Sequence, residues 1–191
     1  VYAYDPFGSR TWSTASSVKS FTTASAASIA VTSPQQSAVA GQASGGIVIQ
    51  LKDSNGNVVK TSANTRVYLT TTSGSGSFSA QTSPFSAITY IDIPANSSSV
   101  TVYYMDSTVG NPTMTFSDSS PPDGATGLED ATQLISITSS TIYTFSYSAI
   151  ATQTAGTPFS VTITARDVYG NVVAGFSGTT SLSSKIGRAH V

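Results

Sequence analysis

The strongest constraint on this chain is a strand–turn–strand pattern that occurs twice. Residues 47–59 and 161–173 both show alternating apolar positions that end at an aspartate, then a Gly-Asn pair, then two valines. The copies begin at positions 47 and 161, so the period is 114 residues. An Ala-Gly pair precedes each copy, at 40–41 and 155–156. A repeat of this period predicts a string of similar folding modules.

The centre of each copy predicts a hairpin turn. Glycine adopts positive φ without strain, and a short polar side chain before it can accept hydrogen bonds from its own backbone. We therefore expect Asp53 to cap the first turn and Gly56 to take a positive φ. Residues 53–57 also alternate oxygen ligands, but an EF-type calcium loop needs glycine at its sixth position and glutamate at its twelfth, where this chain has Gly56 fourth and Asn64 twelfth. The pattern indicates a turn rather than a metal site.

Composition narrows the class of protein. Of the 191 residues, 39% are hydrophobic, which is enough to bury cores of ordinary size in one or two domains. Only 9% are charged and the net charge is -1, so we expect no nucleic-acid partner and no contact with an anionic membrane. The chain has no cysteine, which excludes disulfides and thiolate zinc sites. It also lacks an apolar run of about 18 residues that could span a bilayer.

The order of strand and turn signals predicts a complete module over residues 26–139. Short alternating segments separated by turn residues are typical of an antiparallel β-sandwich with Greek-key connections. Val67 and Leu69 are expected to face its core. The strands expected in this module are 28–32, 46–52, 65–72, 87–93, 99–105, 113–117 and 133–137.

Two incomplete modules flank the complete one. Residues 1–25 contain strand-like segments at 1–5 and 17–23, and residues 140–184 begin a further module with Tyr143, Phe145 and Tyr147 in alternation. A half-sandwich leaves an apolar face and a free strand edge, so we expect the last module to pack on something, to swap or to be disordered. The predicted fold class is all-β, with tandem immunoglobulin-like antiparallel β-sandwiches, one complete and two truncated.

Several motifs resemble known extracellular modules. The repeated Asp-x-x-Gly-Asn-Val-Val turn, the Ile-Pro-Ala-Asn-Ser-Ser-Ser-Val stretch at 93–100 and the segment at 103–113 resemble bacterial immunoglobulin-like repeats of the invasin and intimin type. Residues 1–25, with Trp12 between their two strand-like segments, resemble the C-terminal hairpin of a fibronectin type III domain. These resemblances imply a secreted or surface-attached rod of modules, and hence an extracellular or cell-surface location.

Acidic residues are concentrated in one expected loop, 118–130, near a module junction. Carboxylates at such a junction can share a calcium ion that stiffens a rod, although we favour a solvated polar loop. The four candidate calcium ligands are Asp118, Asp123, Glu129 and Asp130.

Catalytic and ligand-binding signals are weak. The remaining carboxylates, such as Asp92 and Asp106, show no spacing that brings a pair together, so we expect no enzyme and no catalytic residue. Trp12, Tyr103 and Tyr104 could stack on a sugar, but aromatic residues on strands more often pack in a core. Asn96 begins an Asn-Ser-Ser glycosylation pattern, which we interpret as a turn.

The function these observations favour is a structural stalk or spacer in a bacterial secreted or cell-surface, adhesin-like protein. Its partners would be the neighbouring modules of the same chain. Two alternatives stay open: accessory or linker modules of a secreted polysaccharide-active enzyme, and a module that binds a glycan or a host surface protein.

The last seven residues, 185–191, match the translation of a sequencing adapter, AAG-ATC-GGA-AGA-GCA-CAC-GTC. On this interpretation His190, the only histidine, is not encoded by the gene. We predict that long reads of the source DNA will show different codons after Ser184. Recovery of codons for 185–191 would make the adapter interpretation wrong.

Overall fold

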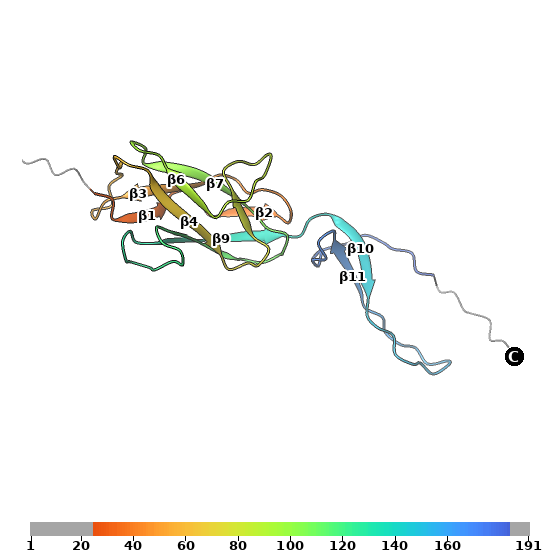
Figure 1. The fold of residues 1–191 in the computed structure, drawn as a ribbon. Helices are drawn as coiled ribbons and strands as arrows, with labels where there is room; N and C mark the ends of the chain where they lie inside the picture. Colours follow the sequence, from red (N-terminus) through yellow and green to blue (C-terminus); the bar gives the residue numbers. More distant parts are fainter. Residues whose placement is uncertain (1–24, 184–191) are drawn as a thin grey trace, which may run out of the picture.

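Alternating apolar residues between positions 28 and 138 form two sheets that share one core. The computed structural model describes residues 25–183. The two sheets lie face to face, with strand orders β1-β3-β7-β5 and β2-β9-β8-β4-β6 (Figure 1). The first sheet consists of β1 (Ser28–Val31), β3 (Ile47–Lys52), β7 (Ser99–Met105) and β5 (Ser77–Ser79). The second consists of β2 (Gln36–Val39), β9 (Ala131–Thr138), β8 (Thr113–Ser117), β4 (Thr65–Thr71) and β6 (Tyr90–Ile93).

The predicted all-β sandwich is confirmed. Residues 25–183 contain no helix, and hence no helix that could cross a membrane. Every strand pair is antiparallel except β2 with β9, where Ala38 lies opposite Ile137 in a parallel register. The parallel pair arises because the chain leaves β1 in one sheet and enters β2 in the other sheet.

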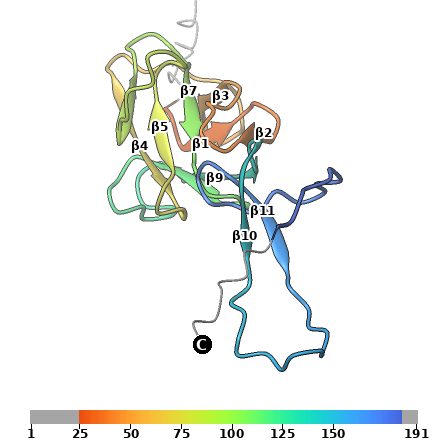
Figure 2. The same cartoon turned by 90° about the vertical axis from the view of Figure 1, so that its right-hand side faces the viewer.

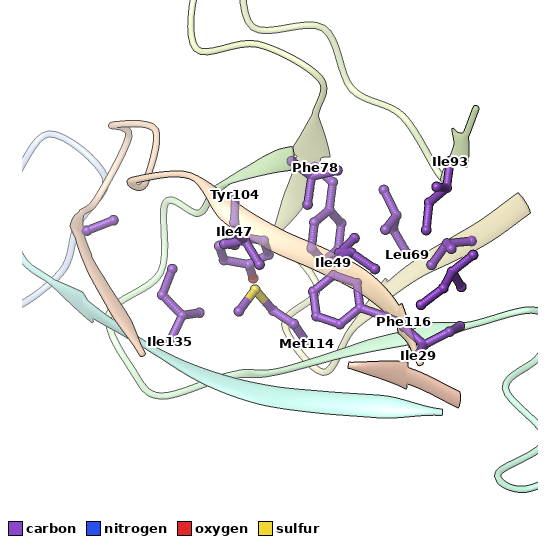
Figure 3. Close-up of a cluster of buried hydrophobic side chains, with 14 of the residues drawn as sticks. Ile29, Ile47, Ile49, Leu69, Phe78, Ile93, Tyr104, Met114, Phe116 and Ile135 are labelled. Carbon is purple, nitrogen blue, oxygen red and sulfur yellow. The ribbon is translucent and has the colours of Figure 1, made fainter. Parts of the chain in front are cut away.

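The side chains between the sheets form a single cluster, shown in Figure 3. Phe78 packs edge to face on Tyr104, with ring centroids 5.1 Å apart, and on Phe116, with centroids 6.0 Å apart. Every buried residue of the cluster lies between Ile29 and Ile137. The module therefore has a complete core of its own.

Most expected strands are present, and the exceptions have physical causes. Val67 and Leu69 are buried as expected. The strand expected from residue 87 begins only at Tyr90, and sequence reasoning missed β2 and β5. Strand β5 lies in a Gly/Ser-rich segment whose one large apolar residue is Phe78, so its sequence shows too little alternation to indicate a strand. Residues 1–5 and 17–23 lie outside the described residues.

The complete sandwich over residues 26–139 is called the first module below, and the module that begins at residue 140 is called the second. The second module starts with a two-stranded hairpin of β10 (Ile142–Tyr147) and β11 (Ile163–Asp167). Figure 2 shows this hairpin projecting from the sandwich at the end where β9 leads into it. Tyr143 and Tyr147 are each 74% exposed. Phe145 and Phe176 pack edge to face and line an open cleft of about 380 Å³. The apolar face expected for a half-sandwich is therefore exposed here.

We predict that Phe78→Ala lowers the free energy of unfolding by about 3–5 kcal/mol, because it removes a buried ring and leaves a cavity between the sheets. Urea unfolding of the whole chain measures this. The matched control is Val58→Ala, at an exposed position, which should cost less than about 0.5 kcal/mol. Equal losses in the two variants would contradict the assignment of Phe78 to the core.

Candidate functional site

The repeated turn closes on its own aspartate, as the sequence predicts. In the first copy, Asp53 Oδ1 accepts hydrogen bonds from the backbone N–H groups of Asn55, at 2.9 Å, and Asn57, at 2.8 Å. Asp53 Oδ2 accepts a third from the Asn57 side-chain amide at 3.1 Å. Gly56 takes a φ of +80°, which glycine adopts without strain.

The second copy repeats these bonds residue by residue. Asp167 Oδ1 accepts from the N–H groups of Tyr169, at 3.0 Å, and Asn171, at 2.9 Å. Asp167 Oδ2 accepts from the Asn171 side-chain amide at 2.9 Å. Gly170 takes a φ of +85°. The sequence repeat is therefore also a repeat of one hydrogen-bonded turn.

The second turn contacts the end of the first module through Asn171. Asn171 Nδ2 donates to the carbonyl oxygen of Ser107 at 2.8 Å, and the N–H of Val109 donates to Asn171 Oδ1 at 3.1 Å. Asp167 Oδ2 also accepts from the N–H of Ser140, in the linker after β9, at 3.0 Å. One amide side chain thus pairs with backbone groups of the neighbouring module on both its donor and its acceptor side.

Tyr169 completes this contact by lying against Gly41. A Cβ built on Gly41 would collide with the Tyr169 ring and hydroxyl, and Gly41 has a φ of +78°. The N–H of Gly41 also donates to the carbonyl of Asp106 at 2.8 Å. Gly41 is therefore required for its backbone conformation and for the close approach of the tyrosine.

The loop that receives Asn171 is held by a buried carboxylate. Asp106 is 1% exposed, and its oxygens accept from Ser75 Oγ at 2.6 Å, Tyr104 Oη at 2.8 Å and the N–H of Thr108 at 2.9 Å. These three bonds fix the backbone between β7 and β8, next to Ser107 and Val109. The receiving surface is therefore ordered by the first module itself.

Burial and hydrogen bonding shift the pKa of these carboxyl groups in opposite directions. Burial by itself raises the pKa of Asp106 and of Asp167, but the hydrogen bonds they accept leave the pKa of each below its ordinary value. The amide of Asn57 likewise lowers the pKa of Asp53. Burial raises the pKa of Tyr104 to about 12, so its hydroxyl stays protonated as a donor to Asp106.

Three of the residues considered for catalysis or sugar binding, Asp92, Asp106 and Tyr104, make structural contacts. Asp92 forms an ion pair with Arg66, with Nε 2.9 Å from Oδ1, while Asp106 is buried in its own network. Tyr104 is fully buried, so the suggestion that it stacks on a sugar is wrong, whereas Tyr103 is half-buried. Trp12 lies outside the described residues.

Asn96 occupies a turn, as expected from its sequence. It has a φ of +63°, and the N–H of Ser97 donates to the carbonyl of Pro94 at 2.9 Å.

The acidic loop lies at the opposite pole of the first module, where the chain enters. The backbone of Glu129 forms hydrogen bonds there with the backbone of Ala27 and Ile29. Its side chain is exposed and does not belong to the cluster formed by the three aspartates of the loop. Asp118, Asp123 and Asp130 each place an oxygen within 4.8 Å of the other two. Asp118 Oδ2 accepts from the N–H of Leu128 at 3.0 Å, and Asp130 Oδ2 from that of Gly124 at 2.9 Å.

The other oxygen of each of these two carboxylates, Asp118 Oδ1 and Asp130 Oδ1, is buried without a hydrogen-bond partner among residues 25–183. Carboxylate oxygens are ligands of the kind that calcium takes. Three of the four residues of the expected cluster are thus brought together, and calcium binding stays a prediction.

Comparison with known proteins returns structural similarities only. No protein-family model and no curated protein matches the chain. The chain is similar to the S-layer protein rSbsC(31-844), with 18% identity over 81% of this chain and 18% of that one and a TM-score of 0.41. For domains 5-6 of SbsC the identity is 17%, over 78% of this chain and 66% of that one, with a TM-score of 0.41. For a beta-glycosidase from Bacteroides vulgatus the identity is 19%, over 59% of this chain and 14% of that one, with a TM-score of 0.41. The chain thus spans about a fifth of the length of the first of these proteins.

Sequence reasoning found the repeated turn but missed its contact with the neighbouring module. Asn171, Tyr169 and Gly41 carry that contact, and no spacing in the sequence relates Gly41 to Tyr169. The Ala-Gly pair before each copy does not signal this contact, since a Cβ at Gly156 would meet no other group whereas one at Gly41 would collide with Tyr169.

We predict that Asp106→Asn lowers the free energy of unfolding at neutral pH by about 2 kcal/mol, because the amide cannot accept all three buried hydrogen bonds. The folded-state pKa of Asp106 lies below 3.8, so the unfolded chain takes up this proton first as the pH falls. Its stabilisation is present above that value and is lost as the pH falls through the folded-state pKa.

Urea unfolding between about pH 5 and pH 2 should therefore show a shallower acid loss in Asp106→Asn than in the parent chain. Val58→Ala leaves every carboxylate in place and should keep the parent slope. The same slope in Asp106→Asn as in the parent chain would contradict this role of Asp106.

Proposed function

We propose that this chain is a non-enzymatic spacer segment of a bacterial surface or secreted multidomain protein, in which rigidly joined β-sandwiches separate a functional end from its anchor. The observation that carries the proposal is the contact of Asn171 with the backbone of Ser107 and Val109. A spacer needs joints that resist bending, and this contact joins two modules through directional hydrogen bonds.

The connection between the modules is also short. Strand β9 ends at Thr138 and β10 begins at Ile142, so residues 139–141 form the whole linker. Within that linker, Ser140 donates its N–H to Asp167. A short linker that is itself hydrogen-bonded leaves few directions in which the second module can swing.

The path of the chain suits an elongated array. The first module is entered at one end of the sandwich and left for β10 at the other (Figure 1). Each module of this kind therefore adds its length to the array.

Export and surface attachment are supported by the resemblance of the turn and of residues 93–113 to invasin-type and intimin-type repeats. Reading the gene in both directions tests this part of the proposal. Further modules that lead to a wall or membrane anchor are expected. A catalytic domain for polysaccharide cleavage in the same reading frame would contradict the spacer role and support accessory modules of an enzyme.

Rigidity is tested by pulsed electron spin resonance on the whole chain, which has no native cysteine to interfere with labelling. With spin labels at Lys60→Cys and Thr144→Cys, both exposed positions, we predict one narrow distance distribution. Asn171→Ala should broaden it, because the variant loses both hydrogen bonds to the first module.

The control is Val168→Ala in the same turn, where the side chain is exposed, and it should keep the narrow distribution. A distribution that is already as broad in the parent chain as in Asn171→Ala would overturn the rigid-spacer proposal.

A further inference from the structure

We infer that the Asp53–Asn57 turn is a second docking end, built to receive the β7–β8 loop of a preceding module of this same fold. This inference rests on the proposed function, since it extends the joint seen at Asn171 to the other pole of the first module. The partner is thus the immunoglobulin-like sandwich that precedes this module in the same chain, whose last residues are expected at 1–25.

The two turns match in every internal bond but differ in what lies around them. Lys52 Nζ contacts the carbonyl of Gly56 at 3.4 Å, as Arg166 Nη1 bonds that of Gly170 at 2.7 Å. Asn171 is half-buried because the first module covers it, whereas Asn57 is exposed. Within residues 25–183, the side-chain hydrogen bond of Asn57 goes only to its own turn, through Asp53.

The path of the chain places any preceding module beside this turn. The N–H of Ala27 donates to the carbonyl of Lys52 at 2.8 Å, and Ser28 lies opposite Lys52 in the β1–β3 pair. The chain therefore enters the module next to Asp53. A module joined to the chain directly before Ala27 would have a high effective concentration at Asn57, so a few hydrogen bonds would be enough to dock it.

The chemistry of the partner follows from the bonds of Asn171. The docked loop must offer one backbone carbonyl and, two residues later, one backbone N–H, as Ser107 and Val109 do. An uncharged, hydrogen-bonding loop satisfies this. Asn55 is the residue of the first turn that corresponds to Tyr169 of the second turn. The proposed joint therefore lacks the aromatic contact with a glycine.

The test is a tandem chain in which residues 140–191 are replaced by a second copy of residues 26–139, which keeps the three-residue linker between the two modules. The first module can be duplicated because its whole core lies between Ile29 and Ile137. In this tandem, Asn57 of the second copy meets Ser107 and Val109 of the first copy. Amide hydrogen exchange of Val109 in the first copy, followed by NMR, reports the joint directly.

We expect Val109 to be protected in the tandem, and Asn57→Ala in the second copy to speed its exchange by about tenfold, the effect of losing one hydrogen bond. Asn55→Tyr in the second copy should slow the exchange, since it restores the ring that contacts Gly41. Ser54→Ala, in the same turn, should leave the exchange rate unchanged. An Asn57→Ala rate equal to that of the tandem, or a Ser54→Ala rate equally increased, overturns the inference.

The parent chain separates this inference from the proposal on which it rests. There, Asn171→Ala should speed the exchange of Val109 by a similar factor, because the same N–H loses its acceptor. If Asn171→Ala has this effect and Asn57→Ala does not, the second docking end is absent and the spacer proposal stands. If neither variant changes the exchange of Val109, both fail.

Discussion

Both sides of the module joint depend on one kind of interaction, a buried aspartate that accepts hydrogen bonds from its own loop. Asp106 fixes the receiving loop and Asp167 fixes the docking turn. A carboxylate that accepts several such bonds stays ionised and holds a short segment in one conformation. Because each side is ordered before the two meet, little further conformational entropy is lost when Asn171 docks.

The sandwich was predictable from the sequence wherever apolar and polar residues alternate regularly along a strand. Val67 and Leu69 were placed correctly because period-two alternation leaves one choice of inward face. Strand β5 was not predictable, since Phe78 stands alone among glycine and serine and its place is fixed by its contacts with Tyr104 and Phe116. The parallel pairing of β2 with β9 depends on residues about a hundred positions apart, which no local pattern records.

The candidate site was predictable only in its local part. The turn around Asp53 follows from short-range hydrogen bonding, and its form was anticipated in both copies. The contact between Tyr169 and Gly41 joins two modules, and the burial of Tyr104 depends on the closed sandwich, so neither could be derived from neighbouring residues. The clustering of Asp118, Asp123 and Asp130 was partly predictable, because all three residues belong to one loop.

The contact of Asn171 with backbone atoms alone has an evolutionary consequence. Because both hydrogen bonds of Asn171 go to backbone atoms, they place no demand on which side chains stand at 107 and 109, provided the loop keeps its shape and Gly41 stays opposite Tyr169. Surface residues of the modules can then diverge freely while the joint persists. Unequal recombination within such a gene can add or remove whole units, and each new neighbour pair inherits a working joint.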